Sequence, residues 1–177
     1  MSEFESVFRD APQIDTERLI LRGIEEADLA EVLPVTVYDG LQAQSEKEAR
    51  MMLERIAEDQ RFGHTIHWGI ALKATNRIIG TCGFYRGFWR QVGEIGYILK
   101  PEFRRQGLMF EAIDAMIRYG FDGLQLNRID AFTRHDNIAS VGLLKKLGFN
   151  KGYISRNGFQ QFSKSSQKPP PDRERQE

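Results

Sequence analysis

The chain has 177 residues, of which 41% are hydrophobic and 28% are charged, a composition typical of one globular domain with a substantial core. Basic and acidic residues balance at 25 each, so the net charge of zero does not favour a nucleic-acid partner. The sequence has no apolar run long enough to span a membrane and no signal peptide, so we expect a cytoplasmic protein without a membrane partner. One cysteine, Cys82, and three scattered histidines predict neither a disulfide nor a metal site.

The first half of the chain predicts alternating strand and helix segments. The pattern indicates a strand at 18–22, a helix at 25–32, a helix at about 45–60, and a β-hairpin from strands 67–72 and 77–84. Pro34 ends the first helix, and Ser45 with Glu48 forms a capping box for the second.

The second half predicts the remainder of an α/β fold. In order, it indicates a strand at 92–99, a helix at 106–121, a strand at 127–133, a helix from Asn137 to Gly148, and a strand at 151–155. The strands at 67–99 should form an antiparallel meander, so we expect a mixed, mostly antiparallel sheet flanked by helices. Residues 1–162 are predicted to be a single domain. Residues 163–177 lack apolar residues and are predicted to be a disordered polar tail.

The segment Arg104–Met109 lies between a predicted strand and the helix that follows it. The first backbone N–H groups of a helix have no partner within the helix, and the helix dipole adds positive charge there. Gly107 allows close approach of a phosphate, and Arg104 and Arg105 add charge. The segment therefore predicts an anion site, although a lone basic connection with one glycine is usually only structural.

Residues 16–149 resemble the GCN5-related N-acetyltransferase (GNAT) superfamily, in particular its RimJ/RimL-like branch of ribosomal-protein N-terminal acetyltransferases. The residues that carry this resemblance lie in several separate segments: 16–22, Ile79-Gly80, 94–97, 104–109 with Glu111-Ala112, 127–129, 137–140 and 146–149. Arg104 and Gly107 match the family's loop pattern, whereas Met109 stands where a small residue is usual.

The resemblance implies a GNAT-like fold whose acetyl-CoA site is the strand-to-helix loop after the fourth strand. Acetyl-CoA would be the co-substrate, and no metal is implied. The residues implied for binding it are Arg104, Arg105, Gln106, Gly107, Leu108 and Met109 for the pyrophosphate, Tyr97, Ile98 and Leu99 for the pantetheine arm, and Asn137. Asn137 could equally be a plain helix cap. Ser140, implied to lie near the thiol, could be a solvent-facing serine.

Glu94 and Ser140 are the candidate catalytic residues. Glu94 is a carboxylate within an apolar strand, where partial burial would raise its pKa toward that of a general base. The alternative is a structural glutamate paired with Arg86 or Arg90. Ser140 could protonate the leaving thiolate, and a backbone N–H near Ile98 could stabilise the oxyanion. Cys82, His67 and His135 are expected to be structural.

The expected function is transfer of an acetyl group from acetyl-CoA to a primary amine, in particular the α-amine of a protein or peptide N-terminus. Two alternatives stay open: acetylation of a small amine such as a polyamine, amino acid or aminoglycoside, and a non-catalytic coenzyme A-binding module. Only one strand of the family's C-terminal hairpin is evident in the sequence, so the sequence does not determine how the acceptor side is completed. The protein is expected to be a monomer or a homodimer.

Overall fold

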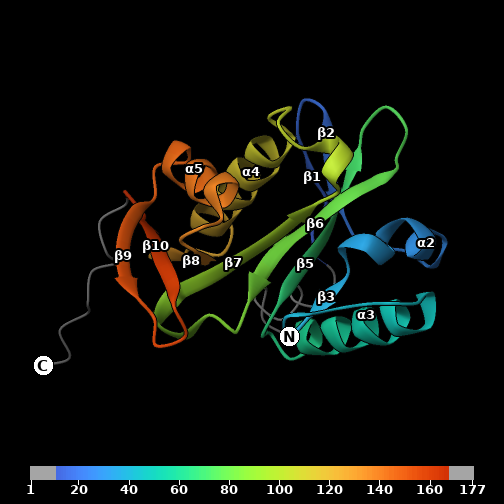
Figure 1. Ribbon diagram of the computed structural model, residues 1–177, viewed down its shortest axis with the longest axis horizontal. Coiled ribbons are helices and arrows are strands. Elements are labelled where there is room, and N and C mark those ends of the chain that lie inside the picture. Colours follow the sequence, from blue (N-terminus) through green and yellow to red (C-terminus); the bar gives the residue numbers. More distant parts are fainter. Residues whose placement is uncertain (1–10, 168–177) are drawn as a thin grey trace, which may run out of the picture.

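The computed structural model describes residues 11–167, which form an eight-stranded sheet with helices on both faces (Figure 1). In spatial order the strands are β1 (Ile14–Asp15), β2 (Leu19–Arg22), β5 (Ile66–Leu72), β6 (Ile78–Tyr85), β7 (Val92–Leu99), β8 (Arg128–Arg134), β10 (Phe159–Ser165) and β9 (Asn150–Ile154). Neighbouring strands are antiparallel except β7 and β8, which are parallel. The predicted mixed, mostly antiparallel sheet is therefore confirmed. A separate short hairpin consists of β3 (Val37–Tyr38) and β4 (Leu41–Gln42).

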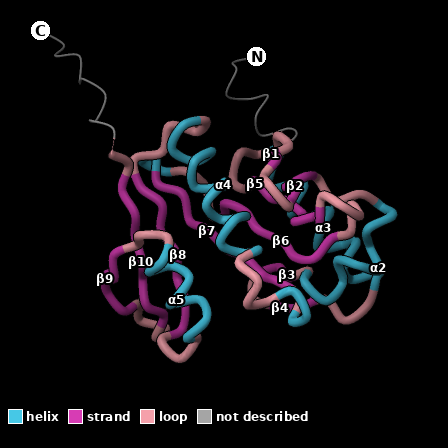
Figure 2. The backbone as a smooth tube through the Cα atoms, turned by 90° about the horizontal axis from the view of Figure 1, so that it is seen from above, coloured by secondary structure: helices cyan, strands magenta, loops and turns pink. Residues whose placement is uncertain are grey.

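The helices divide between the two faces of the sheet, as Figures 1 and 2 show from two directions. Four α-helices are described: α2 (Leu29–Val32), α3 (Glu46–Arg61), α4 (Leu108–Asp122) and α5 (Ile138–Lys146). Strand alternation assigns the faces, since successive side chains point to opposite sides. Leu19 and Leu21 belong to the core with α4 and α5, whereas Ile20 packs against Val32 of α2.

Trp68 and Phe84 are the largest fully buried side chains, and they lie beneath α4. The Trp68 ring meets that of Tyr119 edge to face at a centroid distance of 5.7 Å, and its Nε1 donates to Pro12 O at 2.8 Å. Burial of one such side chain contributes roughly 1.5–3 kcal/mol. The centre of the sheet is therefore a well-packed support for the β7–α4 connection.

The helix ends follow the predicted capping signals, except that only half of the predicted capping box of α3 is formed. Ser45 Oγ accepts from Glu48 N at 3.2 Å, while the Glu48 carboxylate accepts from Gln44 N rather than from the cap residue itself. At the end of α5, Phe149 N donates to Leu144 O at 3.0 Å across Gly148.

The predicted helix at 25–32 is shorter in the structure. Residues Glu26–Asp28 form a 3₁₀ turn, and only Leu29–Val32 are α-helical. The Asp28 carboxylate accepts from Glu25 N at 2.8 Å and pairs with Arg22 at 2.7 Å. These bonds fix the first residues in a tight turn, which explains the difference from the prediction.

The predicted start of the disordered tail is wrong for Ser163–Ser165, which belong to β10. This strand lies between β8 and β9 and is hydrogen-bonded on both sides, so its backbone groups are satisfied without an apolar pattern. Its polar side chains have partners too: Gln161 Nε2 donates to Asp130 Oδ2 at 3.0 Å, and Lys164 Nζ donates to Leu147 O. The C-terminal hairpin is therefore complete. Ser166 and Gln167 follow without helix or strand, with Ser166 N donating to Asn127 O at 2.9 Å, and the remaining residues of the predicted tail, 168–177, lie outside the described residues.

Candidate functional site

The connection from β7 to α4 forms a concave backbone surface. A 3₁₀ turn at Pro101–Phe103 leads into the exposed residues 104–106, and α4 begins directly after Gly107. Arg105 and Gly107 have positive φ values of 61° and 76°. No described side chain caps the start of α4, so its first N–H groups stay open at the positive end of the helix dipole. This geometry can bind an anion.

Gly107 lies beside unfilled space. A Cβ built on it would meet only one described atom outside its neighbours within 4 Å, Arg18 Nη2 at 3.5 Å. Arg104 folds back, with its Nε donating to Leu99 O at 3.1 Å, which ties the loop to the end of β7. The space over the loop is therefore open to a ligand.

Strands β7 and β8 diverge next to this loop. They pair only from Val92 to Ile95, and no described strand pairs with the following residues of β7 on that side. On the other side, Lys100 N donates to Ile79 O at 2.9 Å, and the ladder with β6 is continuous. Hydrogen-bonded pairs recur at every second residue of an antiparallel ladder. The backbone groups of Tyr97 and Leu99 therefore face the gap.

This register corrects one prediction about the oxyanion donor and the pantetheine arm. The N–H and C=O groups of Ile98 face Thr81 on β6, its partner in the register. Of the three residues that the sequence indicated, Tyr97 and Leu99 present their N–H groups to the gap, and Ile98 does not. The sequence could not show this because it does not fix the hydrogen-bonding phase of a strand.

Asn137 and Ser140 lie at the start of α5, which follows the carboxyl end of β8. Asn137 Oδ1 accepts from Ser140 N at 3.2 Å, so the cap is present, and Asn137 Nδ2 has no hydrogen bond to any described residue. Ser140 Oγ lies 2.8 Å from Tyr97 Oη. Burial raises the pKa of Tyr97, although the bond to Ser140 lowers it in part, so the phenol stays protonated. The gap between β7 and β8 thus ends in a pair of hydroxyl groups.

Glu94 has the arginine partner of one alternative and the raised pKa expected for the other. Its Oε1 pairs with Arg86 Nε at 3.1 Å, and its side chain is 29% exposed. Burial raises its pKa, the Arg86 charge lowers it, and Asp130 raises it, with a net increase. A carboxylate with a raised pKa is suited to accept a proton, and the ion pair holds it in place.

Glu94 lines a cavity of about 630 Å³ on the α3 side of the sheet, the β7 cavity. Its wall contains further polar side chains: Tyr38, Asp39, Asp59, His64, Thr65, His67, Thr81, Tyr85 and Arg86. His67 Nδ1 and Tyr85 Oη are 2.7 Å apart, and His67 Nε2 is buried without a partner among residues 11–167. Burial lowers the pKa of His67 to about 4. The cavity thus contains a neutral imidazole and one carboxylate of raised pKa.

The residues expected to be structural have structural surroundings, except that His67 also lines the cavity. Cys82 is fully buried, and burial raises the pKa of its thiol. His135 is exposed in the β8–α5 connection. Within residues 11–167, no three His, Cys, Asp or Glu side chains group as a metal site requires, and no helix is long and apolar enough to cross a membrane.

Three side chains at the site were not among the residues that the sequence predicted there. Arg18 reaches the loop from β2's N-terminal end, the Tyr97 hydroxyl meets Ser140, and Tyr85 meets His67. Arg18 belongs to a segment that the sequence singled out but to which no role was given. Tyr85 and His67 depend on the register of β5 and β6, for which the sequence carries no clear signal.

Comparisons with known proteins agree with this geometry. Residues 18–150 match the family described as the acetyltransferase (GNAT) domain. The chain is 37% identical over 153 residues to the uncharacterized N-acetyltransferase YoaA of Bacillus subtilis strain 168, covering 82% of this chain and 86% of that protein. It is 34% identical over 105 residues to the ribosomal protein uS5-alanine N-acetyltransferase of Escherichia coli strain K12, covering 57% and 54%.

The fold is also similar to that of solved acetyltransferases. RimJ of Mycobacterium smegmatis, solved in complex with CoA-disulfide, superposes with a TM-score of 0.72 at 16% identity, covering 84% of this chain and 82% of that one. The family match spans most of the chain, and the relative YoaA is similar over most of its length. The chain therefore belongs to the GNAT family and is an N-acetyltransferase.

Proposed function

We propose that this chain transfers the acetyl group of acetyl-CoA to the α-amino group at the N-terminus of a protein or peptide. The observation that carries the proposal is the divergence of β7 and β8 directly beside the open start of α4. The divergence leaves backbone groups for an extended arm, and the helix start offers amides for an anion. Acetyl-CoA has both parts, an extended pantetheine and a pyrophosphate.

The pyrophosphate is assigned to the backbone amides of residues 104–109. The left-handed conformations of Arg105 and Gly107 turn successive N–H groups toward a common space, as in other anion-binding concavities. The open space over Gly107 supports this assignment.

The pantetheine arm is assigned to the gap between β7 and β8. There it would hydrogen-bond the backbone of Tyr97 and Leu99 as an added strand does, while the side chain of Ile98 lines the β7 cavity on the other side. Asn137 Nδ2, which is free of described partners, would donate to an amide carbonyl of the arm.

Glu94 is assigned as the group that accepts the amine proton, directly or through water. An α-amine has an ordinary pKa of about 7.7–8, so a modest base is sufficient, whereas a lysine near 10.4 requires more assistance. Gly96 presents no side chain between Glu94 and Ile98 on the cavity face of β7, and the ring of Tyr85 lies over it, since a Cβ there would meet Tyr85 Cε2 at 3.0 Å. The Ser140 hydroxyl, paired with Tyr97, would supply a proton to the leaving thiolate.

The choice of an N-terminal amine rests on two further points. The sequence is similar to a uS5-alanine N-acetyltransferase, although over little more than half of the chain. In addition, the β7 cavity has three acidic side chains, Asp39, Asp59 and Glu94, together with the basic Arg86 that pairs with Glu94. A polycationic acceptor would therefore meet only a small net negative charge. Both points favour a peptide over a polyamine.

The test is an acetylation assay that separates the amine classes. Purified protein is incubated with acetyl-CoA and one of four acceptors: a peptide with a free N-terminus and no lysine, its N-terminally blocked counterpart with one lysine, a polyamine, or an aminoglycoside. Thiol release and product mass are measured. We expect acetylation of the first peptide alone, on its first residue. Transfer to the blocked peptide or only to the small amines would refute the N-terminal assignment, and absence of transfer to every amine would refute the proposal.

A further inference from the structure

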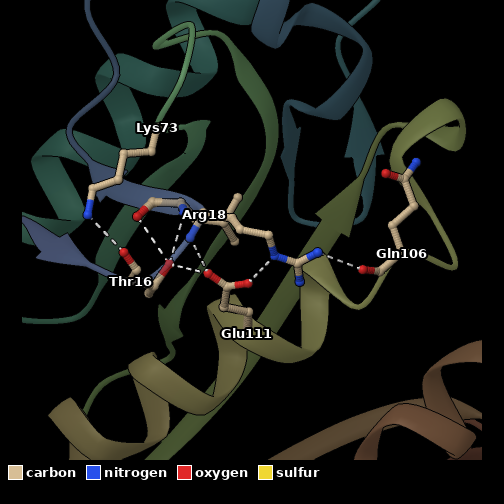
Figure 3. Close-up of polar contacts among 6 residues, drawn as sticks. Thr16, Arg18, Lys73, Gln106 and Glu111 are labelled. Atoms are coloured by element: carbon tan, nitrogen blue, oxygen red, sulfur yellow. Dashed lines mark hydrogen bonds and ion pairs between the residues drawn. The ribbon is translucent and has the colours of Figure 1, made fainter.

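One carboxylate of α4 holds the segment Thr16–Arg18 in place (Figure 3). Glu111 Oε1 accepts from Thr16 Oγ1 at 2.6 Å and from Arg18 N at 2.7 Å, and its Oε2 accepts from Arg18 Nε at 2.7 Å. Burial raises the pKa of Glu111, but the hydrogen bonds from Thr16 and Arg18 lower it to a net value below its ordinary one. Glu111 is therefore charged near neutral pH and fixes one edge of the Arg18 guanidinium.

The other edge of this guanidinium meets the loop. Arg18 Nη1 donates to the carbonyl of Gln106 at 3.0 Å, as Figure 3 shows. Arg18 Nη2 lies 3.5 Å from the position of a Cβ on Gly107 and has no hydrogen bond to any described residue. The side chain is 46% exposed, so this nitrogen is accessible to a ligand over the loop.

The bond to Gln106 has a consequence for the loop amides. The C=O of Gln106 and the N–H of Gly107 belong to one planar trans peptide and point in opposite directions. A guanidinium that holds this carbonyl therefore also fixes the direction of the Gly107 N–H. This peptide precedes Gly107, which has no Cβ and therefore restricts rotation of the peptide little. Without Arg18, fewer contacts oppose rotation of this peptide. Such a rotation would turn the Gln106 carbonyl toward the phosphate space.

We propose that Arg18, oriented by Glu111, is a positioning residue for the coenzyme A pyrophosphate. It fixes the Gln106–Gly107 peptide with its amide available to the anion and places one free guanidinium nitrogen beside Gly107. Glu111 acts through Arg18. The segment Thr16–Arg18 is thereby part of the cofactor site, although it lies about 90 residues before the loop in sequence. This inference rests on the coenzyme A site of the proposed function.

The test compares ligands with and without the pyrophosphate. Calorimetry measures the affinity for coenzyme A. Thermal shift at millimolar ligand concentration measures the binding of pantetheine, which lacks the nucleotide and both phosphates of the bridge. We expect Arg18→Gln to weaken coenzyme A binding about 10- to 100-fold, the loss typical of a charge-assisted hydrogen bond, with an unchanged pantetheine shift. Arg18→Lys keeps the charge without the fork and should restore only part of the affinity.

A double-mutant cycle tests the role of Glu111. Glu111→Gln should weaken coenzyme A binding in the wild-type background and have little further effect in the Arg18→Gln background, because its effect passes through Arg18. Lys73→Gln is the matched control: Lys73 Nζ donates to Thr16 O at 2.8 Å in the same network (Figure 3) but does not contact the loop. Its coenzyme A affinity should stay within twofold of wild type.

The outcomes separate this inference from the proposed function. If the wild-type chain does not bind coenzyme A, the cofactor assignment fails and this inference with it. If the wild type binds and folded Arg18→Gln binds equally well, only the inference is wrong. Equal weakening of coenzyme A and pantetheine, or additive effects of the two substitutions, would also refute it, since either result indicates a general structural role.

Discussion

Replacing Gly107 by alanine should separate backbone strain from obstruction of the cofactor. Gly107 has φ of 76°, and an added Cβ would meet Arg18 Nη2 at 3.5 Å, an ordinary contact distance. The substitution therefore creates no clash with described residues. A left-handed conformation costs an L-residue about 1–2 kcal/mol, so we expect a small loss of stability, about 2–4 °C in the melting midpoint for each kcal/mol.

The effect on coenzyme A should be larger than this strain explains. A methyl group at this position would lie beside Arg18 Nη2 and would keep a phosphate from that nitrogen, and a charge-assisted hydrogen bond contributes about 1.5–3 kcal/mol. We expect coenzyme A affinity to fall at least about tenfold. In Gly107→Glu the carboxylate would also repel the anion, by about 4 kcal/mol for charges 4 Å apart near a surface, and it would compete for Arg18. That variant should show no calorimetric binding.

Gly158 provides the matched control for strain. It has φ of 79°, a Cβ there would meet nothing within 4 Å, and it lies in the β9–β10 turn. Gly158→Ala should lose as much stability as Gly107→Ala while it binds coenzyme A normally. Wild-type affinity in folded Gly107→Ala, or an equal loss of affinity in both variants, would show that the ligand does not occupy the space over Gly107.

Three further predictions concern catalysis, pH and the C-terminal strand. Glu94→Gln should lower kcat about 100-fold with little change in coenzyme A affinity, and full activity across the pH profile would leave Glu94 a structural residue. The pKa of His67 lies near 4 in the folded chain against an ordinary 6.5, so the unfolded chain binds more protons between these values. The free energy of unfolding of the wild type should therefore fall by up to about 3 kcal/mol relative to that of His67→Asn as pH falls from 6.5 to 4. Equal pH dependence of the two unfolding free energies, measured by denaturation, would contradict this. A chain truncated after Gln167 should have the melting midpoint of the wild type. A chain truncated after Phe162 loses the pairing of 163–165 with β8 and should melt several degrees lower. Equal melting midpoints of the two truncated chains would support the prediction that the tail begins at residue 163.

The sequence was sufficient to predict the strand end, turn and helix start around residues 99–109 because the relevant signals are local. An anion site at the start of α4 needs a strand end, a few turn residues and a helix start, and all lie within residues 99–109. Likewise the Asn137 cap and the Gly148 stop depend on neighbours in the chain. By contrast, β10 was predicted only in part, because its polar side chains are satisfied by partners such as Asp130 and Leu147 that the sequence places far away.

The acceptor side depends on contacts that no local pattern encodes. Glu94 has a raised pKa because of its depth beside the β7 cavity, and it is held by Arg86, two alternatives that the sequence treated as exclusive. An ion pair at a half-buried carboxylate restricts its position without cancelling the effect of burial on its pKa. The Arg86 pair should therefore orient Glu94 in the folded chain, while approach of an ammonium group would compete with Arg86 for the same carboxylate. Under the proposed function, recognition of the amine and acceptance of its proton would then be two properties of one side chain.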